Sequence, residues 1–284
     1  MTGSPGWRAV LVAAATAGTW LVWLGLARAT APRSRWQRSN FRGAAVTLAG
    51  GLAGLVAIAL GAALLAGGVG VTGARSDVRR IALAVLVAAG AAGVIGLVDD
   101  LLGDSRTKGF RGHLGALRHG RASTGLAKVV VIVAGAAVAA MVLGDGAFGR
   151  QQLVDTGVIA GSANLINLLD LRPGRALKAV LAVALPVTFL ADSAPGLVAA
   201  WPAGVAAGLL SPDLSERSML GDGGANALGA AVGTVLAASG GLLASALVLA
   251  GLVALTATSE VVSFSALIER TPGLRGLDRL GRRP

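Results

Sequence analysis

The stretch IALAVLVAAGAAGVIGLVDD, residues 81–100, decides the class of fold. Residues 81–98 carry no charge, and an apolar run of this length is typical of a helix that crosses a lipid bilayer. Asp99 and Asp100 end the run side by side. Carboxylates at the edge of a membrane segment are costly to place, and two adjacent ones repel each other. We therefore expect positive charge to be bound next to them.

The composition extends this conclusion to the whole chain. Hydrophobic residues make up 54% of the 284 residues and charged residues only 14%, whereas soluble domains have about 25% charged residues. The mean hydropathy is +0.73. We expect an all-α polytopic integral membrane protein, a single transmembrane domain over residues 1–284 with about nine transmembrane helices. The expected spans are residues 7–26, 44–66, 80–98, 125–144, 153–169, 177–191, 196–210, 223–239 and 241–258.

The composition also excludes several kinds of function. The chain has no cysteine, which excludes disulfides and thiolate metal sites. Its net charge of +11 could suit nucleic acid, but the basic residues lie in short loops between apolar segments, and no nucleic-acid-binding motif is present. We therefore expect no nucleic-acid partner. The 43 glycines are expected to let membrane helices pack closely.

The basic residues predict how the chain is oriented in the membrane. Of the 25 lysine and arginine residues, 20 fall on or next to one side. This side comprises the loops 27–43, 99–124, 170–178 and 211–222 and the tail 259–284. The positive-inside rule assigns it to the cytoplasm, with the N-terminus outside and the C-terminus cytoplasmic. Ten of the 14 acidic residues share this side, which predicts an active surface on the cytoplasmic face of the plasma (inner) membrane.

The first candidate cluster on this side is the acid pair itself. Adjacent carboxylates at a membrane boundary, here Asp99 and Asp100, suit a hard divalent cation such as Mg²⁺. This ion takes oxygen ligands and often shares them with substrate phosphates. The alternative is a solvated helix end whose acids pair with Arg106 and Lys108.

A second cluster lies in GSANLINLLDLRPGRALK, residues 161–178. Asn164, Asn167 and Asp170 are spaced i, i+3 and i+6, so on a helix they lie near one face. Amides and acids inside a membrane helix usually mark functional sites. The three side chains are expected to converge on one spot, and hydrogen bonding between helices is the alternative.

A third cluster is MLGDGGANALG, residues 219–229, in which Asp222 stands between glycines at the start of an expected span. Glycine lets a backbone approach a ligand closely, and a helix N-terminus favours anions such as phosphate. The alternative is an ordinary N-cap aspartate.

The fourth cluster is the basic loop 105–128. Its cations, among them Lys108, Arg111 and Lys128, are candidates for binding a diphosphate or anionic lipid headgroups. Simple anchoring of the loop by positive charge is the alternative. Lys128 differs from the others because it lies at the start of an expected span.

The order of these motifs resembles that of the polyprenyl-phosphate N-acetylhexosamine-1-phosphate transferases. The pattern is VDD, then N-x-x-N-x-x-D, then L-G-D-x-G-(A/S), and the resemblance runs from about residue 40 to 260. The segment NFRGAAVTLAGG, residues 40–51, is similar to an early cytoplasmic segment of the family, with Thr47 in the matching place. The family includes phospho-MurNAc-pentapeptide translocase and the GlcNAc-1-phosphate transferases that start O-antigen and teichoic acid synthesis.

The resemblance implies a reaction and a set of partners. A polyprenyl phosphate attacks the sugar-bearing phosphorus of a UDP-sugar, which gives polyprenyl-diphosphate-sugar and UMP for cell-envelope glycans such as peptidoglycan. Mg²⁺, with Mn²⁺ as the alternative ion, would neutralise the reacting anions. The family often dimerises, so a homodimer is also expected.

The resemblance also implies roles for the candidate residues. The expected catalytic residues are Asp99, Asp100 and Asp222. Asp222 and Asp100 are expected to bind the metal ion, and one of the pair Asp99 and Asp100 to accept a proton from the lipid phosphate. The expected substrate-binding residues are Thr47, Lys108, Arg111, Lys128, Asn164, Asn167 and Asp170.

The chain departs from the family pattern at several places. Pro173 replaces the second acid of the family's N-x-x-N-x-x-D-G-x-D segment, and Gly103 stands where the family has a lysine or an acid. The C-terminal SALIERTPGLRGLDRLGRRP lacks the family's histidine-rich loop. These losses fall on nucleotide-sugar recognition and leave the aspartates in place, so an unusual donor is expected.

Two other functions compete with the transferase. One is a catalytically inactive relative that binds lipid-linked precursors as a partner in cell-envelope assembly, which Pro173 and the missing histidines favour. The other is a transporter. Transporter ion sites lie near the bilayer midplane, whereas the acids of this chain gather at one face, so the transporter ranks last.

Overall fold

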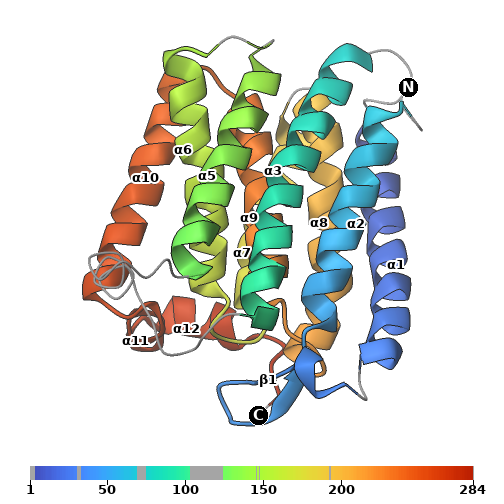
Figure 1. The fold of residues 1–284 in the computed structure, drawn as a ribbon, viewed down its shortest axis with the longest axis vertical. Helices are drawn as coiled ribbons and strands as arrows, with labels where there is room; N and C mark the ends of the chain where they lie inside the picture. The colour runs from blue at the N-terminus through green and yellow to red at the C-terminus, as the bar shows by residue number, and fades with distance from the viewer. Residues whose placement is uncertain are drawn as a thin grey trace.

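The computed structural model describes residues 4–30, 33–68, 75–102, 124–144, 146, 148–191 and 193–283. Within this part of the chain, nine long helices stand side by side in a bundle, and successive helices run in opposite directions (Figure 1). They are α1 (Pro5–Thr30), α2 (Ala49–Ala66), α3 (Arg75–Leu102), α5 (Thr124–Leu143), α6 (Arg150–Leu169), α7 (Arg175–Leu190), α8 (Ser193–Leu214), α9 (Gly221–Ala238) and α10 (Leu242–Val261).

Six of the described helices, α1, α2, α3, α5, α8 and α10, are long and apolar enough to cross a membrane. This confirms the expectation of a helical, multi-pass membrane protein. The count of nine spans and the orientation across the membrane stay predictions. The helices α6, α7 and α9 complete the bundle, and α9 is buried along nearly its whole length.

The buried helix α9 packs mainly against α3 and α6. Two glycines make the close approach possible. A Cβ atom on Gly96 of α3 would collide with the carbonyl of Asp222, and one on Gly51 of α2 would collide with the carbonyl of Leu220. Small residues of this kind let membrane helices meet backbone to backbone. As a result, the last turn of α3 reaches the first turn of α9.

A short hairpin departs from the all-α expectation. A 3₁₀ turn (Ser34–Trp36) leads into strand β1 (Gln37–Ser39), which pairs antiparallel with β2 (Ala45–Thr47). The expected span 44–66 is therefore wrong at its start, because α2 begins only at Ala49. A tertiary contact explains the difference: the carbonyl of Thr47 accepts a hydrogen bond from the N–H of Met219 at 3.0 Å, which holds β2 extended.

The C-terminal tail adds two short helices, α11 (Phe264–Arg270) and α12 (Pro272–Arg279). They lie across the lower end of the bundle in Figure 1. Asp278, in α12, joins the tail to Arg175, in α7. Its buried carboxylate accepts two hydrogen bonds from the Arg175 guanidinium, at 2.8 and 3.1 Å. Bidentate arginine–carboxylate pairs of this kind fix the relative orientation of the two side chains as well as their distance. The tail is thus docked on the start of α7.

Candidate active site

Five of the candidate residues lie at one end of the bundle. Asp99 and Asp100 are in the last turn of α3, and Lys128 is near the start of α5. Asp170 directly follows α6, and Asp222 is in the first turn of α9. Because α3 and α6 run toward this end while α5 and α9 run away from it, residues far apart in sequence meet there.

Asp100 binds the N-terminus of α9. Its Oδ1 accepts a hydrogen bond from the backbone N–H of Asp222 at 3.1 Å, and its Oδ2 accepts one from the N–H of Gly223 at 2.9 Å. The first N–H groups of a helix lack helical partners and carry partial positive charge, so a carboxylate is stabilised there. The positive partner of Asp100 is therefore mainly a helix end.

Gly221 is the residue that permits this contact. It has a φ of +60°, which favours glycine over residues with a side chain. A Cβ atom at this position would also lie 2.8 Å from Oδ2 of Asp100. The glycine before Asp222 thus serves both the backbone turn into α9 and the approach of the carboxylate.

Lys128 holds the other half of the acid pair. Its Nζ donates to Oδ2 of Asp99 at 2.9 Å and also to Oδ2 of Asp222. The three side chains are mostly shielded, with exposed fractions of 18%, 19% and 27%. Ion pairs so little exposed to water are screened less than surface pairs. Lys128 thus connects α3, α5 and α9 through charge.

Asp170 faces the same helix end from α6. Burial raises the pKa of its carboxyl well above the ordinary value. The negative charges of Asp213, Asp222 and Asp100 raise that pKa further, and a hydrogen bond from the N–H of Gly221 opposes the rise. Four neighbouring carboxylates resist full ionisation. Asp170 therefore keeps its proton to a higher pH than an ordinary aspartate does.

The hairpin packs against this end of the bundle. The Arg38 guanidinium, on β1, donates a hydrogen bond to the backbone carbonyl of Asp100. Thr47, on β2, exchanges a hydrogen bond with Thr30 between the two hydroxyls at 2.9 Å, and its Oγ1 accepts one from the N–H of Ala49 at 3.2 Å. Thr47 therefore fastens the hairpin to α1 and α2, and its expected substrate contact stays a prediction.

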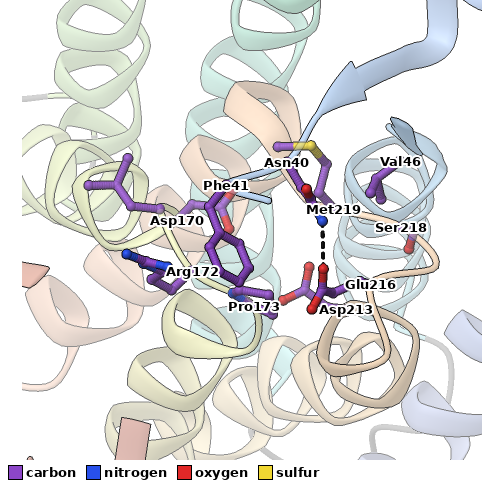
Figure 2. Close-up of a pocket in the computed structure, with 11 residues that line it drawn as sticks. Asn40, Phe41, Val46, Asp170, Arg172, Pro173, Asp213, Glu216, Ser218 and Met219 are labelled. Atoms are coloured by element: carbon purple, nitrogen blue, oxygen red, sulfur yellow. Dashed lines mark hydrogen bonds between the residues drawn. The ribbon is translucent and has the colours of Figure 1, made fainter. Parts of the chain in front are cut away.

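A small pocket opens beside Asp170 (Figure 2). Phe41, from the turn of the hairpin, forms one wall, and the Arg172 guanidinium lies 4.4 Å from the centre of its ring. Asn40 donates to Glu216 at 2.6 Å, the dashed line in Figure 2. The pocket thus places an aromatic ring, an amide and acids next to the aspartates.

The asparagines of α6 do not gather as expected. Asn164 is exposed and donates to Oγ1 of Thr256 on α10 at 3.4 Å, away from the aspartates. The reason is geometric: six residues of helix turn by about 600°, so Asn164 and Asp170 point about 120° apart and stand about 9 Å apart along the axis. The expectation that all three polar side chains converge is therefore wrong for Asn164. Asn167 is half-buried, and its carbonyl accepts the N–H of Asp170 at 3.1 Å.

Two further candidates, Lys108 and Arg111, lie outside the described residues. The same is true of Asp104, which follows Asp100 by four residues. Conversely, two residues at this end of the bundle, Arg38 and Asp213, were not among the candidates predicted from the sequence. Asp213 is buried and accepts a hydrogen bond from the N–H of Gly174 at 2.5 Å, at the start of α7. Neither residue stands out in the sequence, because Asp213 lies in the polar segment SPDLSER, residues 211–217, and Arg38 is one of many loop cations.

The donor set fits a hard divalent cation by its chemistry. Asp99, Asp100, Asp170 and Asp222 present oxygen, which Mg²⁺ prefers, and a single ammonium group bridges two of them. No three acidic or histidine side chains in the described part of the chain form a ready-made metal site. However, Mg²⁺ usually takes one or two carboxylates together with substrate phosphates. The expected metal-binding role of Asp222 and Asp100 stays a prediction.

Comparisons with known proteins give no family assignment: no family model matches the chain, and no curated protein matches it. The interpretation of this end of the bundle therefore rests on its residues and their contacts.

Proposed function

We propose that the chain transfers a sugar-1-phosphate from a UDP-sugar to polyprenyl phosphate at the membrane surface. The observation that supports it is the meeting of Asp99, Asp100, Asp222 and Lys128, which come from three helices and match the order of the family's motifs. An isolated N-cap aspartate or a solvated acid pair would not require Lys128 to bridge both motifs.

In this reaction an oxygen of the lipid phosphate forms a bond to the sugar-bearing phosphorus, and the bond from that phosphorus to UMP breaks. Both reactants are anions, so positioning and neutralisation supply most of the catalysis. Mg²⁺, held by Asp222 and Asp100, would withdraw charge from the diphosphate. Lys128 is placed to exchange its carboxylate partners for phosphate oxygens.

The proton requirement of this reaction is small. A phosphate monoester loses its second proton near pH ~6, so the lipid phosphate is largely ionised at neutral pH. Asp99, which reaches the same ammonium group as Asp222, is placed to take the remaining proton. A cation bound beside Asp170 would oppose the rise in its pKa and favour its ionised form.

A second candidate function is a precursor-binding relative without catalysis. It is favoured by the docked tail, since Nε of Arg282 donates to the carbonyl of Pro173 at 2.8 Å. The tail therefore lies against the segment in which the family pattern is broken. A fixed tail at this position would leave the aspartates in place while restricting access to a nucleotide-sugar.

The test uses purified full-length protein, decaprenyl or undecaprenyl phosphate, Mg²⁺ and a panel of UDP-sugars, with UMP release as the readout. We expect release with at least one donor, abolished by EDTA and restored by Mg²⁺ or Mn²⁺. Asp222→Asn and Asp100→Asn should each lower the rate about 100-fold or more. Glu260→Gln, an exposed carboxylate on α10, is the matched control and should leave the rate unchanged.

Two outcomes would separate the candidates. UMP release that survives both aspartate substitutions would refute the transferase mechanism. Saturable binding of polyprenyl phosphate without UMP from any donor would favour the precursor-binding relative. In that case a chain truncated after Val262 should be assayed as well, to show whether removal of the tail restores turnover.

A further inference from the structure

A second cavity lies at the opposite end of the bundle, the upper end in Figure 1, and it has a volume of about 530 Å³. Volumes of this size are typical of sites for small molecules. The walls come from the ends of α3, α5, α6, α7, α8 and α9. Its polar lining consists of Asp77, Arg80, Gln151, Gln152, Asp155 and Ser239.

Asp155 is the unusual member of this lining. It is only 3% exposed, and its carboxylate oxygens accept hydrogen bonds from Nε2 of Gln151, both at 2.9 Å. The hydroxyl of Ser245, on α10, donates to Oδ1 at 2.7 Å. All these donors are neutral, and within the described part of the chain no cation forms a salt bridge with Asp155. A buried carboxylate surrounded only by neutral donors is compensated best by a cation that reaches it from the cavity.

The cavity also holds a cation of its own. Arg80 pairs with Asp77 at 3.0 Å, and both side chains are partly exposed, at 35% and 57%. The guanidinium carries five N–H donors in a planar fork that is well shaped for a phosphate, so it can bind one while it keeps its acidic partner. The cavity thus offers a carboxylate for an ammonium group and a guanidinium for an anion.

The rim of the cavity is apolar. Leu190, which lines it, is 85% exposed, and Leu143 lies in the same wall. Both residues end helices of the bundle, where acyl chains of the surrounding bilayer would pass. A ligand with a polar head inside and an apolar tail outside matches this arrangement.

We propose that this cavity binds a phosphoethanolamine group, with its primary ammonium at Asp155 and its phosphate at Arg80. A primary ammonium has three N–H donors for the carboxylate and the Gln151 carbonyl, whereas a trimethylated ammonium has none. The group can belong to a phospholipid headgroup or to the free soluble compound. The proposal is independent of the transferase reaction, because the cavity lies at the other end of the helices.

The test is calorimetric titration of full-length protein in detergent with short-chain phosphatidylethanolamine, phosphatidylcholine and phosphatidylglycerol, and with free phosphoethanolamine. We expect saturable binding of phosphatidylethanolamine, at least about tenfold tighter than phosphatidylcholine. Tighter binding of the lipid than of free phosphoethanolamine identifies a headgroup site, and equal binding identifies a site for the soluble group. Either result supports the proposed chemistry.

Variants make the test specific. Asp155→Asn should weaken binding about tenfold, and Arg80→Gln, at a partly exposed position, should weaken it as well. Glu260→Gln is the control. Equal affinity for phosphatidylcholine and phosphatidylethanolamine would overturn the proposal. So would unchanged binding in Asp155→Asn and Arg80→Gln, or stabilisation by Na⁺ or K⁺ salts alone.

Discussion

The two ends of the bundle each shield a carboxylate, but they satisfy it with different donors. Asp100 accepts hydrogen bonds from two backbone N–H groups of α9, whereas Asp155, among the described residues, accepts them only from the side chains of Gln151 and Ser245. Backbone donors are fixed by the helix and cannot turn away, while a hydroxyl or an amide can rotate to suit a new partner. The first end therefore enforces one geometry, and the second can adapt.

The largest loss of stability at the first end of the bundle is expected from Gly221→Ala. A side chain at a positive φ costs about 1–2 kcal/mol, and the displaced Asp100 loses hydrogen bonds to the helix end, so a total near ~3 kcal/mol is expected. Thermal unfolding in detergent measures it. The control is Gly273→Ala in α12, where a Cβ atom meets nothing within 4 Å. Equal melting of the two variants would show that the Gly221 contact is unimportant.

The next largest effect is expected from Lys128→Gln. Removing the ammonium leaves Asp99 and Asp222 facing each other, which should cost about 2 kcal/mol, less than for a fully buried pair because the side chains are partly exposed. Added Mg²⁺ should then raise the melting temperature of the variant more than that of the wild type. Lys128→Arg, which keeps the charge, is the control, and a Mg²⁺ response identical in all three proteins would contradict the shared site.

A direct comparison of the two carboxylates uses Asp100→Asn and Asp155→Asn. The asparagine amide at position 100 would point N–H groups at the fixed N–H groups of α9, so a loss of about 1–2 kcal/mol is expected. At position 155 Gln151 and Ser245 can reorient, so the loss should stay below about 1 kcal/mol. Denaturant or thermal unfolding of both variants decides it, and a larger loss at position 155 would reverse the interpretation.

The helices were the more predictable part of this molecule. The uncharged run 81–98 indicated a membrane helix because burial in lipid demands apolar side chains over a fixed length. The start of α2 was not predictable in this way. Residues 45–47 are apolar enough to continue a helix, but their pairing with β1 and the contact of Thr47 with Met219, in the loop before α9, keep them extended. Such pairing depends on the assembled fold.

For the candidate site, the sequence indicated which residues gather but not which partner each one takes. Alternation of loops across the membrane was enough to place Asp99, Asp100 and Asp222 at one end. The partner of Asp100 depends on the exact contact of α3 with α9, which the small volume of Gly96 allows. The prediction failed for Asn164 for a different reason. Six residues turn a helix by about 600°, so Asn164 and Asp170 point in different directions although their spacing suggested one face.

The smallest expected effect is a pH dependence that separates Asp170 from Asp278. Burial among other acids raises the pKa of Asp170 in the folded protein. The fold thus binds the proton more tightly than the unfolded chain does, and this stability is present below the unfolded pKa and lost as the pH rises through the folded pKa. Asp170→Asn should therefore melt a few degrees above the wild type at pH 8, and the gap should close toward pH ~4.

Asp278 should behave in the reverse sense. Burial alone would raise its pKa, but hydrogen bonds and charge from Arg175 and Arg282 outweigh burial and lower it. Its stabilisation is present above the unfolded pKa and is lost as the pH falls through the folded pKa, so Asp278→Asn should cost most near pH 7 and least in acid. Melting curves between pH 4 and 8 test both variants together. Because a bound cation favours the ionised form of Asp170, Mg²⁺ should stabilise the wild type more at pH 8 than at pH 5. This pH-dependent stabilisation should shrink in Asp170→Asn but persist in Asp278→Asn. A Mg²⁺ gain independent of pH would mean that Asp170 keeps its proton when the cation binds.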